Sequence, residues 1–414
     1  MVLKRRHWIP PGALAFAQLA HGVSWVLLTI VAVRAGVDTL SGPALAWIHT
    51  VALGWLTMSA LGILIHVVPS FTDLRWRNET IVRGSLLPFA AGVLLLVIGW
   101  FLTPVLVVIG ALCITAAFLG YYIVSVRTLW RARAMEKAER AIARALTINL
   151  SFFLIVALIG TAMSVAIAFG WFAALLLRLP GIHANLAFYG WLTMLVYGVS
   201  ARTMRPLCGV RSRFAWMHVA FGLSVLAGPV FVAIGIGTGQ DALRWFGAGI
   251  IGVGALAYAF DIVDIVRRAT VRHRPPQAFV VSAVAWLVLS VVLGFGTMLG
   301  KSWAPAYVFV VLVGWIGQMV NAHFLHIGVR LIATIVRGDD DETPPATLLD
   351  RRLSWFSLVG MQSAVLLCCA GLLVQNARLV EIGAIPGLCA WFALVANGAV
   401  VTTRAKALPI SLVS

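Results

Sequence analysis

The chain has 414 residues, of which 61% are hydrophobic and only 11% are charged, and its formal net charge is +17. A soluble domain of this length needs a larger share of polar residues to cover its surface, so this composition excludes an ordinary soluble enzyme. It predicts instead a protein whose apolar side chains face lipid.

Apolar runs of about 20 residues or more recur along the whole sequence, long enough at about 1.5 Å per residue to cross about 30 Å of hydrocarbon. Backbone polar groups in lipid must hydrogen-bond within their own segment, so each run is expected to be a helix. The predicted fold class is all-α, a polytopic integral membrane protein with about twelve transmembrane helices. In chain order these helices are expected at 12–35, 42–70, 84–101, 104–126, 147–177, 180–204, 214–238, 244–266, 277–299, 304–336, 353–376 and 379–403.

The basic residues are distributed unevenly over the turns between these helices. With the N-terminus assigned to the cytoplasm, the cytoplasmic segments hold 26 of the 31 lysines and arginines. The opposite side holds only Arg34, Arg178, Arg244, Lys301 and Arg378. This positive-inside pattern predicts a multi-pass protein of the bacterial cytoplasmic (inner) membrane with both termini in the cytoplasm. The positive charge then sets topology and contacts anionic membrane lipids, and no nucleic-acid role is expected.

Few residues are left outside the predicted helices, so 1–414 is expected to form a single transmembrane domain. The first apolar run is too long for a cleaved signal peptide and is interpreted as helix 1. The longest turn, Thr128–Leu146, carries charges of both signs and could extend the preceding helix, whereas the acidic run in Gly338–Arg352 predicts a solvated loop. The five cysteines form no C-x-x-C pair, so neither a disulfide framework nor a cysteine metal site is expected.

An internal repeat divides the sequence into three. The string Gly-Trp-Leu-Thr-Met begins at Gly54 and again at Gly190, and a weaker copy begins at Gly314. The copies lie on every fourth predicted helix, which predicts three four-helix units around a pseudo-threefold axis. The units are expected to span about 1–140, 141–268 and 269–414. Twelve residues after the motif glycine stand His66, Arg202 and His326.

Close packing through small residues explains the motif glycines but not the histidines. Seven of the nine histidines fall within predicted helices, where ionisable side chains are costly and tend to be paired or functional. Neutral imidazole is also a common ligand of haem iron and copper. His49 and His183 are expected within about two turns of the outer surface, at nearly matching places in two units, and are the first candidates to bind a metal or cofactor. A second group, His66, His323 and His326, is expected in the inner half, the last two on one helix face.

Three four-helix units in twelve helices resemble the catalytic subunit of the haem–copper oxidases. The stretches Trp47–Trp55 and His183–Trp191 are similar to that family's H-x-H-L-x3-G-W signature. More closely, the chain resembles the short subunit-I-like homologues, and it is similar to the NnrS-type haem proteins of nitric-oxide defence. The stretch Val67–Thr72, which closes helix 2, resembles both.

The resemblance implies that His49 is a ligand of the low-spin haem and His183 a ligand of the copper centre. It also implies two haem ligands on helix 10, where this chain has Tyr307 and Phe309. A His-His copper pair should stand on helix 7, where Ala227–Phe231 contains no histidine. An oxygen-reducing binuclear centre is therefore not expected, and any copper site would be incomplete.

The expected function is that of a membrane protein that binds haem b, with oxidase-like architecture and no oxidase activity, the iron being held by His49, His183 or both. Its role would be electron transfer or a nitric-oxide or respiratory stress response, and its partner another membrane subunit or a redox protein. The alternatives are a non-catalytic partner subunit and a cofactor-free transporter or channel with an inner polar relay. The relay candidates are His21, His66, Arg202, His218, Asp261, Asp264, Asn321, His323 and His326.

Overall fold

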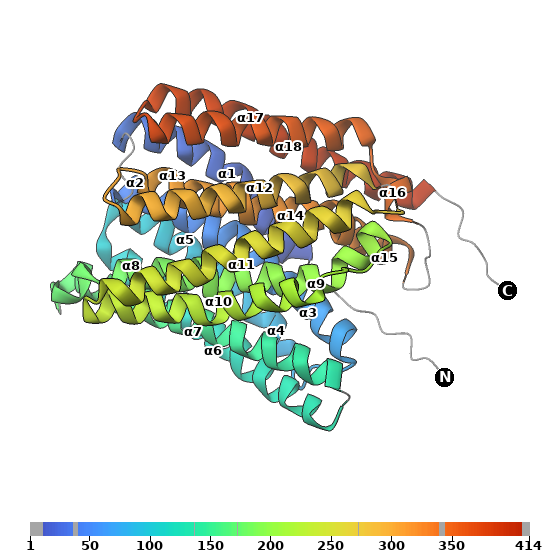
Figure 1. Ribbon diagram of the computed structural model, residues 1–414, viewed down its shortest axis with the longest axis horizontal. Coiled ribbons are helices and arrows are strands. Elements are labelled where there is room, and N and C mark those ends of the chain that lie inside the picture. The colour runs from blue at the N-terminus through green and yellow to red at the C-terminus, as the bar shows by residue number, and fades with distance from the viewer. Residues whose placement is uncertain are drawn as a thin grey trace.

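A computed structural model describes residues 11–35, 40–135, 137–171, 173–271, 273–338 and 344–407. Within these ranges the chain is helical and contains no β-strand. Long helices run side by side in one bundle, with α17 and α18 along the upper edge and α6 and α7 along the lower edge of Figure 1. Eleven of the described helices are long and apolar enough to cross a membrane. The chain is therefore a multi-pass helical membrane protein, as its composition predicts.

The bounds of the helices agree with the apolar runs. The elements that precede the second repeat are α1 (Pro11–Ala35), α2 (Gly42–His49), η1 (Thr50–Thr57), α3 (Met58–Thr72), α4 (Glu79–Gly84), α5 (Leu86–Leu102), α6 (Pro104–Leu129), η2 (Trp130–Ala134), α7 (Lys137–Phe169) and η3 (Ala173–Leu177). The middle elements are α8 (Leu179–Asn185), η4 (Leu186–Thr193), α9 (Met194–Cys208), α10 (Ala215–Thr238), α11 (Asp241–Arg267) and α12 (Arg274–Met298). The last are α13 (Ala304–Phe309), η5 (Val310–Gly317), α14 (Gln318–His323), η6 (Phe324–Gly328), α15 (Val329–Arg337), α16 (Pro345–Leu348), α17 (Arg351–Leu373) and α18 (Ala377–Ala407).

One predicted membrane helix is not among the eleven. The helix formed by α8, η4 and α9 is continuous from Leu179 to Cys208. It carries His183, Asn185 and Arg202, and these polar side chains lower its hydropathy below that of its neighbours.

Three of the long helices contain a π-helical stretch of eight residues, a geometry that is rare and often found at functional sites. These stretches are η1, η4 and η5, and in each the motif glycine is the fifth residue. The N–H of Met58 after η1 bonds the carbonyl of Leu53, five residues back, and the N–H of Met194 after η4 bonds that of Tyr189. The sequence repeat is therefore also a repeat of unusual backbone geometry.

The first and last long helices pack against each other in antiparallel fashion. The Trp391 indole of α18 donates a 2.7 Å hydrogen bond to the Gln18 carbonyl of α1. One to two turns further along α1, Trp25 lies against Gly387 of α18. The beginning of α1 and the end of α18 consequently lie at the same end of the bundle. We call this the inner end, and α3, α9 and α15 also end there; the other end is the outer end.

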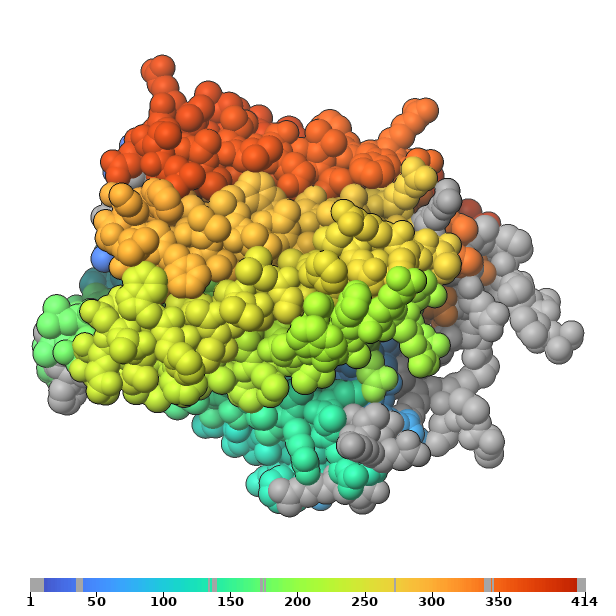
Figure 2. Space-filling model, viewed as in Figure 1, coloured from blue at the N-terminus to red at the C-terminus, as the bar shows by residue number. Residues whose placement is uncertain are grey.

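The outside of the bundle is apolar, which is the reverse of a soluble protein. Figure 2 shows the face covered by α10, α11 and α12. Large apolar side chains stand out from the surface, among them Val253 of α11 at 71% exposure and Leu223 of α10 at 60%. Continuous exposed apolar surface of this kind needs an apolar solvent, which a lipid bilayer provides.

The turn predicted at Thr128–Leu146 is mostly helical. Helix α6 continues to Leu129 and α7 already begins at Lys137. The stretch is rich in alanine, arginine, glutamate and lysine, which are good helix formers, so the helices extend beyond the apolar runs. The acidic run of the second loop, residues 339–342, lies outside the described residues.

Candidate functional site

The two histidines predicted at the outer end meet in the structure. His49 is the last residue of α2, directly before the π-helical η1, and His183 lies in α8 directly before η4. Their ring centroids are 6.4 Å apart and the ring planes differ by 38°. Both residues are half-buried. Side chains from two repeats are thus brought into one site.

Hydrogen bonding determines which nitrogen of His49 is available. Its Nδ1 lies 2.7 Å from the carbonyl oxygen of Leu45, one turn back on α2. A carbonyl only accepts hydrogen bonds, so Nδ1 carries the proton and Nε2 keeps a lone pair. Histidines that bind metals are commonly oriented by this kind of contact. The Trp100 ring stacks beside His49 at a centroid distance of 6.2 Å and limits its movement.

His183 lies against a glycine of a neighbouring helix. A Cβ atom added at Gly160 of α7 would be 3.1 Å from the His183 Cε1 atom, closer than nearly all real contacts. Gly160 therefore leaves the space that the imidazole occupies. The Nδ1 atom of His183 is buried and has no hydrogen-bond partner. A buried polar atom without a partner is a feature that needs an explanation, and a bound group is one.

The donor set of this site is limited to two imidazoles. No cluster of three or more histidine, cysteine, aspartate or glutamate side chains is present in the part of the chain that the structure describes. A copper site built from three protein ligands is therefore not formed there. Two imidazoles on opposite sides of one metal, each at about 2.0–2.1 Å, have ring centres roughly 6 Å apart. A metal held by this pair alone would therefore need further ligands from the group that contains it.

The inner histidines have different bonding partners. His323 and His326, which were expected on one helix face, are close enough to interact electrostatically, and each has a different further neighbour. His323 Nε2 is 2.9 Å from the Thr203 hydroxyl of α9, whereas the His326 ring packs edge-on against His273 with centroids 5.7 Å apart. The π-helical η6 begins directly after His323 and changes the angular step between the two residues. His66 bonds Ser70 on its own helix, with Nε2 and hydroxyl oxygen 3.3 Å apart.

Of the remaining relay candidates, His21 and Asn321 are buried without hydrogen-bond partners for their side chains, and the others have local contacts. Arg202 lies over the ring of Phe71, and His218 Nδ1 is 3.4 Å from a carboxylate oxygen of Asp261. Asp264 is bound by Arg268. These contacts divide the predicted relay into local pairs.

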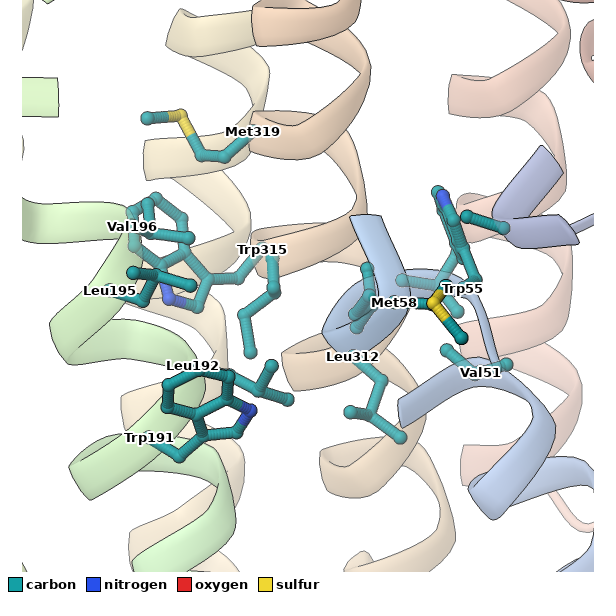
Figure 3. Close-up of a cluster of buried hydrophobic side chains, with 14 of the residues drawn as sticks. Val51, Trp55, Met58, Trp191, Leu192, Leu195, Val196, Leu312, Trp315 and Met319 are labelled. Atoms are coloured by element: carbon teal, nitrogen blue, oxygen red, sulfur yellow. The ribbon is translucent and has the colours of Figure 1, made fainter. Parts of the chain in front are cut away.

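Sequence reasoning missed a set of contacts that join the three motif helices. The Trp191 indole donates a 3.0 Å hydrogen bond to the Thr57 hydroxyl, and the Trp315 indole donates one of 3.1 Å to Thr193. Each bond runs from the tryptophan of one motif to the threonine position of another. Figure 3 shows Trp55, Trp191 and Trp315 on their three helices. The sequence feature that could have indicated these contacts is the threonine that follows the tryptophan in the repeated motif.

The third contact of this set is different. The position that corresponds to Thr57 and Thr193 is Gly317, which has no hydroxyl group. Trp55 lies against it, since a Cβ at Gly317 would be 2.7 Å from the Trp55 ring, and the Trp55 indole nitrogen has no hydrogen-bond partner. The contacts therefore close a ring of three helices in which two of three links are hydrogen bonds.

A cavity of about 70 Å³ lies between the same three helices on the inner side of the π-helical stretches. Corresponding positions of the three motifs line it. The second residues after the motif glycine are Leu56, Leu192 and Ile316, and the ninth are Ile63, Val199 and His323. The fifth and sixth residues of all three motifs line it as well. The cavity thus lies between corresponding positions of the three motif helices, and we call it the axial cavity.

With this geometry the protein is a multi-pass helical membrane protein with a histidine pair at the outer end of its bundle. No protein-family model matches the chain, and no curated protein sequence matches it. Its function is therefore argued from the pair and its surroundings.

Proposed function

We propose that this chain is a haem-binding membrane protein in which His49 and His183 are the axial ligands of one haem b, and that it acts in electron transfer or in a nitric-oxide or respiratory stress response. A bound haem would supply one-electron chemistry and gas binding at iron. The polypeptide would hold the two imidazoles in place and keep bulk water away from them.

The 6.4 Å spacing of the two rings is the observation that carries this proposal. It matches the separation of roughly 6 Å expected for two imidazoles on opposite sides of one metal. The Leu45 carbonyl fixes the His49 tautomer so that Nε2 can bind, and the Nδ1 of His183 is buried in the same site. Both features leave the two imidazoles able to bind one group.

The wider architecture is proposed to consist of three four-helix units around a pseudo-threefold axis. Three observations support it: the π-helical stretches share one register, the tryptophan contacts run around a ring, and corresponding residues line the axial cavity. With the Leu179–Cys208 helix added to the eleven, twelve helices would cross the membrane, an even number that agrees with the start of α1 and the end of α18 at the inner end. The excess of basic residues in the turns of that end favours its assignment to the cytoplasm.

The test is to purify the protein from cells supplied with a haem precursor and to record its absorption spectrum. We expect a Soret band and, if both histidines bind, the spectrum of a six-coordinate low-spin haem. Alanine at His49 or His183 should each convert this spectrum to a five-coordinate form or abolish haem binding. Alanine at His323 is the matched control, because that residue is also a half-buried histidine on a motif helix.

The outcomes separate the possibilities. If wild-type protein takes up no haem, in cells or after reconstitution, the proposal is wrong. If haem is bound but both single variants keep the wild-type spectrum, the pair is not the site. A change in one variant only would indicate a single axial ligand and an open coordination position.

One observation favours the second candidate, a cofactor-free transporter or channel. Asp261 of α11 is fully buried and lies beside His218, and buried carboxylates within membrane helices often mark proton or ion pathways. The Ser212 hydroxyl and Tyr258, bonded to Ser200, lie in the same region. Proton uptake into proteoliposomes that depends on Asp261, in protein that is colourless, would support this candidate and contradict the first.

A further inference from the structure

The axial cavity lies between the outer and inner ends of the three motif helices. On its outer side, Val51 and Leu312 and the motif tryptophans are completely or almost completely buried. On its inner side, residues of the same three helices are half-buried, among them Ala60, Val199 and Ile327. The cavity is a pocket within the bundle that is separate from the histidine pair, which precedes the π-helical stretches.

The walls of this pocket are almost entirely apolar. Ser59 and His323 provide its only polar side chains. Both nitrogens of His323 are already in contact with oxygen atoms, the Met319 carbonyl at 2.7 Å and the Thr203 hydroxyl at 2.9 Å. An ordered water needs two to four polar partners, so the pocket offers water little to bind. Walls with so few polar groups favour an apolar molecule over ordered water.

The size of the pocket limits the ligand. A dry cavity of about 150 Å³ accommodates benzene, so about 70 Å³ suits something considerably smaller. We propose that the axial pocket binds one small apolar molecule of the size of a diatomic gas, such as dioxygen or nitric oxide. The proposal goes beyond haem binding and does not depend on it.

Corresponding surfaces of the three motif helices enclose the pocket, and the first repeat provides the smallest side chains. At the fifth and sixth positions after the motif glycine, α3 has Ser59 and Ala60 where α9 has Leu195 and Val196. The free space is therefore expected to lie mainly beside Ser59 and Ala60. Replacing Ser59 and Ala60 of α3 by the leucine and valine found at the corresponding positions of α9 should fill the pocket. The fold already accepts these side chains at the same level of the neighbouring helix.

The test uses xenon as the probe, followed by ¹²⁹Xe NMR on the full chain in nanodiscs, with empty nanodiscs as the reference. Wild-type protein should show a saturable xenon signal distinct from xenon dissolved in lipid. The double variant Ser59→Leu/Ala60→Val should weaken xenon binding at least tenfold. Ala116→Val, on an exposed position of α6, is the matched control and should leave binding unchanged.

Two results would overturn the proposal. One is wild-type protein with no xenon signal beyond that of the lipid. The other is a folded double variant with wild-type xenon affinity, which would place the xenon elsewhere, for example at the lipid-facing surface. If the double variant does not fold, Ala60→Val alone provides the same comparison, because it adds two heavy atoms to the pocket wall. Unchanged xenon affinity in that folded variant would overturn the proposal equally.

Discussion

Replacing Thr57 by valine removes a hydroxyl group and leaves the shape of the side chain almost unchanged. In the structure this hydroxyl accepts the 3.0 Å hydrogen bond from the Trp191 indole, and the threonine and the tryptophan are each only 1% exposed. The variant would leave a buried N–H group without an acceptor. Such an orphaned donor costs about 1–3 kcal/mol, because water cannot replace the lost partner. The link between the first and second motif helices should weaken by that amount.

The expected shift of the thermal midpoint follows from the size of the chain. In domains of 150–250 residues, 1 kcal/mol moves the midpoint by about 2–4 °C, and larger chains shift less. Thr57→Val should therefore lower the midpoint by roughly 2–6 °C. The assay is the reaction of a thiol-reactive dye with Cys208 and Cys368, which are fully buried in the folded protein. Cys389 is exposed and is first replaced by serine to remove the background signal.

Thr50→Val is the matched control. Thr50 lies in the same π-helical stretch and is 4% exposed, but its hydroxyl donates only to the Ala46 carbonyl of its own helix. Losing that bond leaves no donor unsatisfied, so the control should stay within about 0.5 kcal/mol of wild type. Equal midpoints for Thr57→Val and Thr50→Val would refute the reasoning. So would a double-mutant cycle of Thr57→Val with Trp191→Phe that gives no coupling energy.

Three further expectations concern other parts of the molecule. Gly160→Ala should lower the thermal midpoint and alter the spectrum of the haem-loaded protein, because its Cβ would displace the His183 ring; Gly198→Ala, which has open space, should do neither. Burial lowers the pKa of His273 to about 4 in the folded protein, whereas in the unfolded chain this imidazole binds a proton from about pH 6.5 downward. Thermal stability should then fall between pH 7 and pH 5, and His273→Gln should reduce that slope; an identical slope would contradict this. A fluorescent reporter fused after Lys406 should be active in the cytoplasm, and a periplasmic alkaline phosphatase signal there would invert the proposed topology.

The long helices could be predicted closely because their limits are set by solvent and not by packing. The second apolar run was expected at 42–70 and the structure has a helix from Gly42 to Thr72. Charged residues and prolines end such runs wherever the lipid ends, and this is visible in the sequence. The start of α7 at Lys137 was missed for the opposite reason, since a helix that leaves the lipid is continued by helix propensity alone.

The histidine pair could be named from the sequence, but its geometry could not. His49 and His183 occupy positions that differ by two residues relative to their motif glycines, which suggested different faces of two equivalent helices. Which face of each helix points to its neighbour depends on how the helices are rotated in the bundle, and hydropathy does not record that rotation. The different neighbours of His323 and His326 were hidden in the same way, because a π-helical turn arises from packing and leaves no periodic pattern.

The ring of tryptophan contacts gives the three repeats unequal roles. Two links are hydrogen bonds to threonine, but at the third link the motif of η5 has glycine. The Trp55 indole stacks instead on His21 of α1, with ring centroids 3.6 Å apart and ring planes within 4°. A threonine at Gly317 would collide with the Trp55 ring, so the loss of the hydroxyl and the approach of Trp55 depend on each other. His21 is fully buried and neither of its nitrogens has a partner. The missing threonine therefore leaves unsatisfied polar groups on Trp55 and His21, and the substitutions that test the ring should have their largest effects at the two links that are hydrogen bonds.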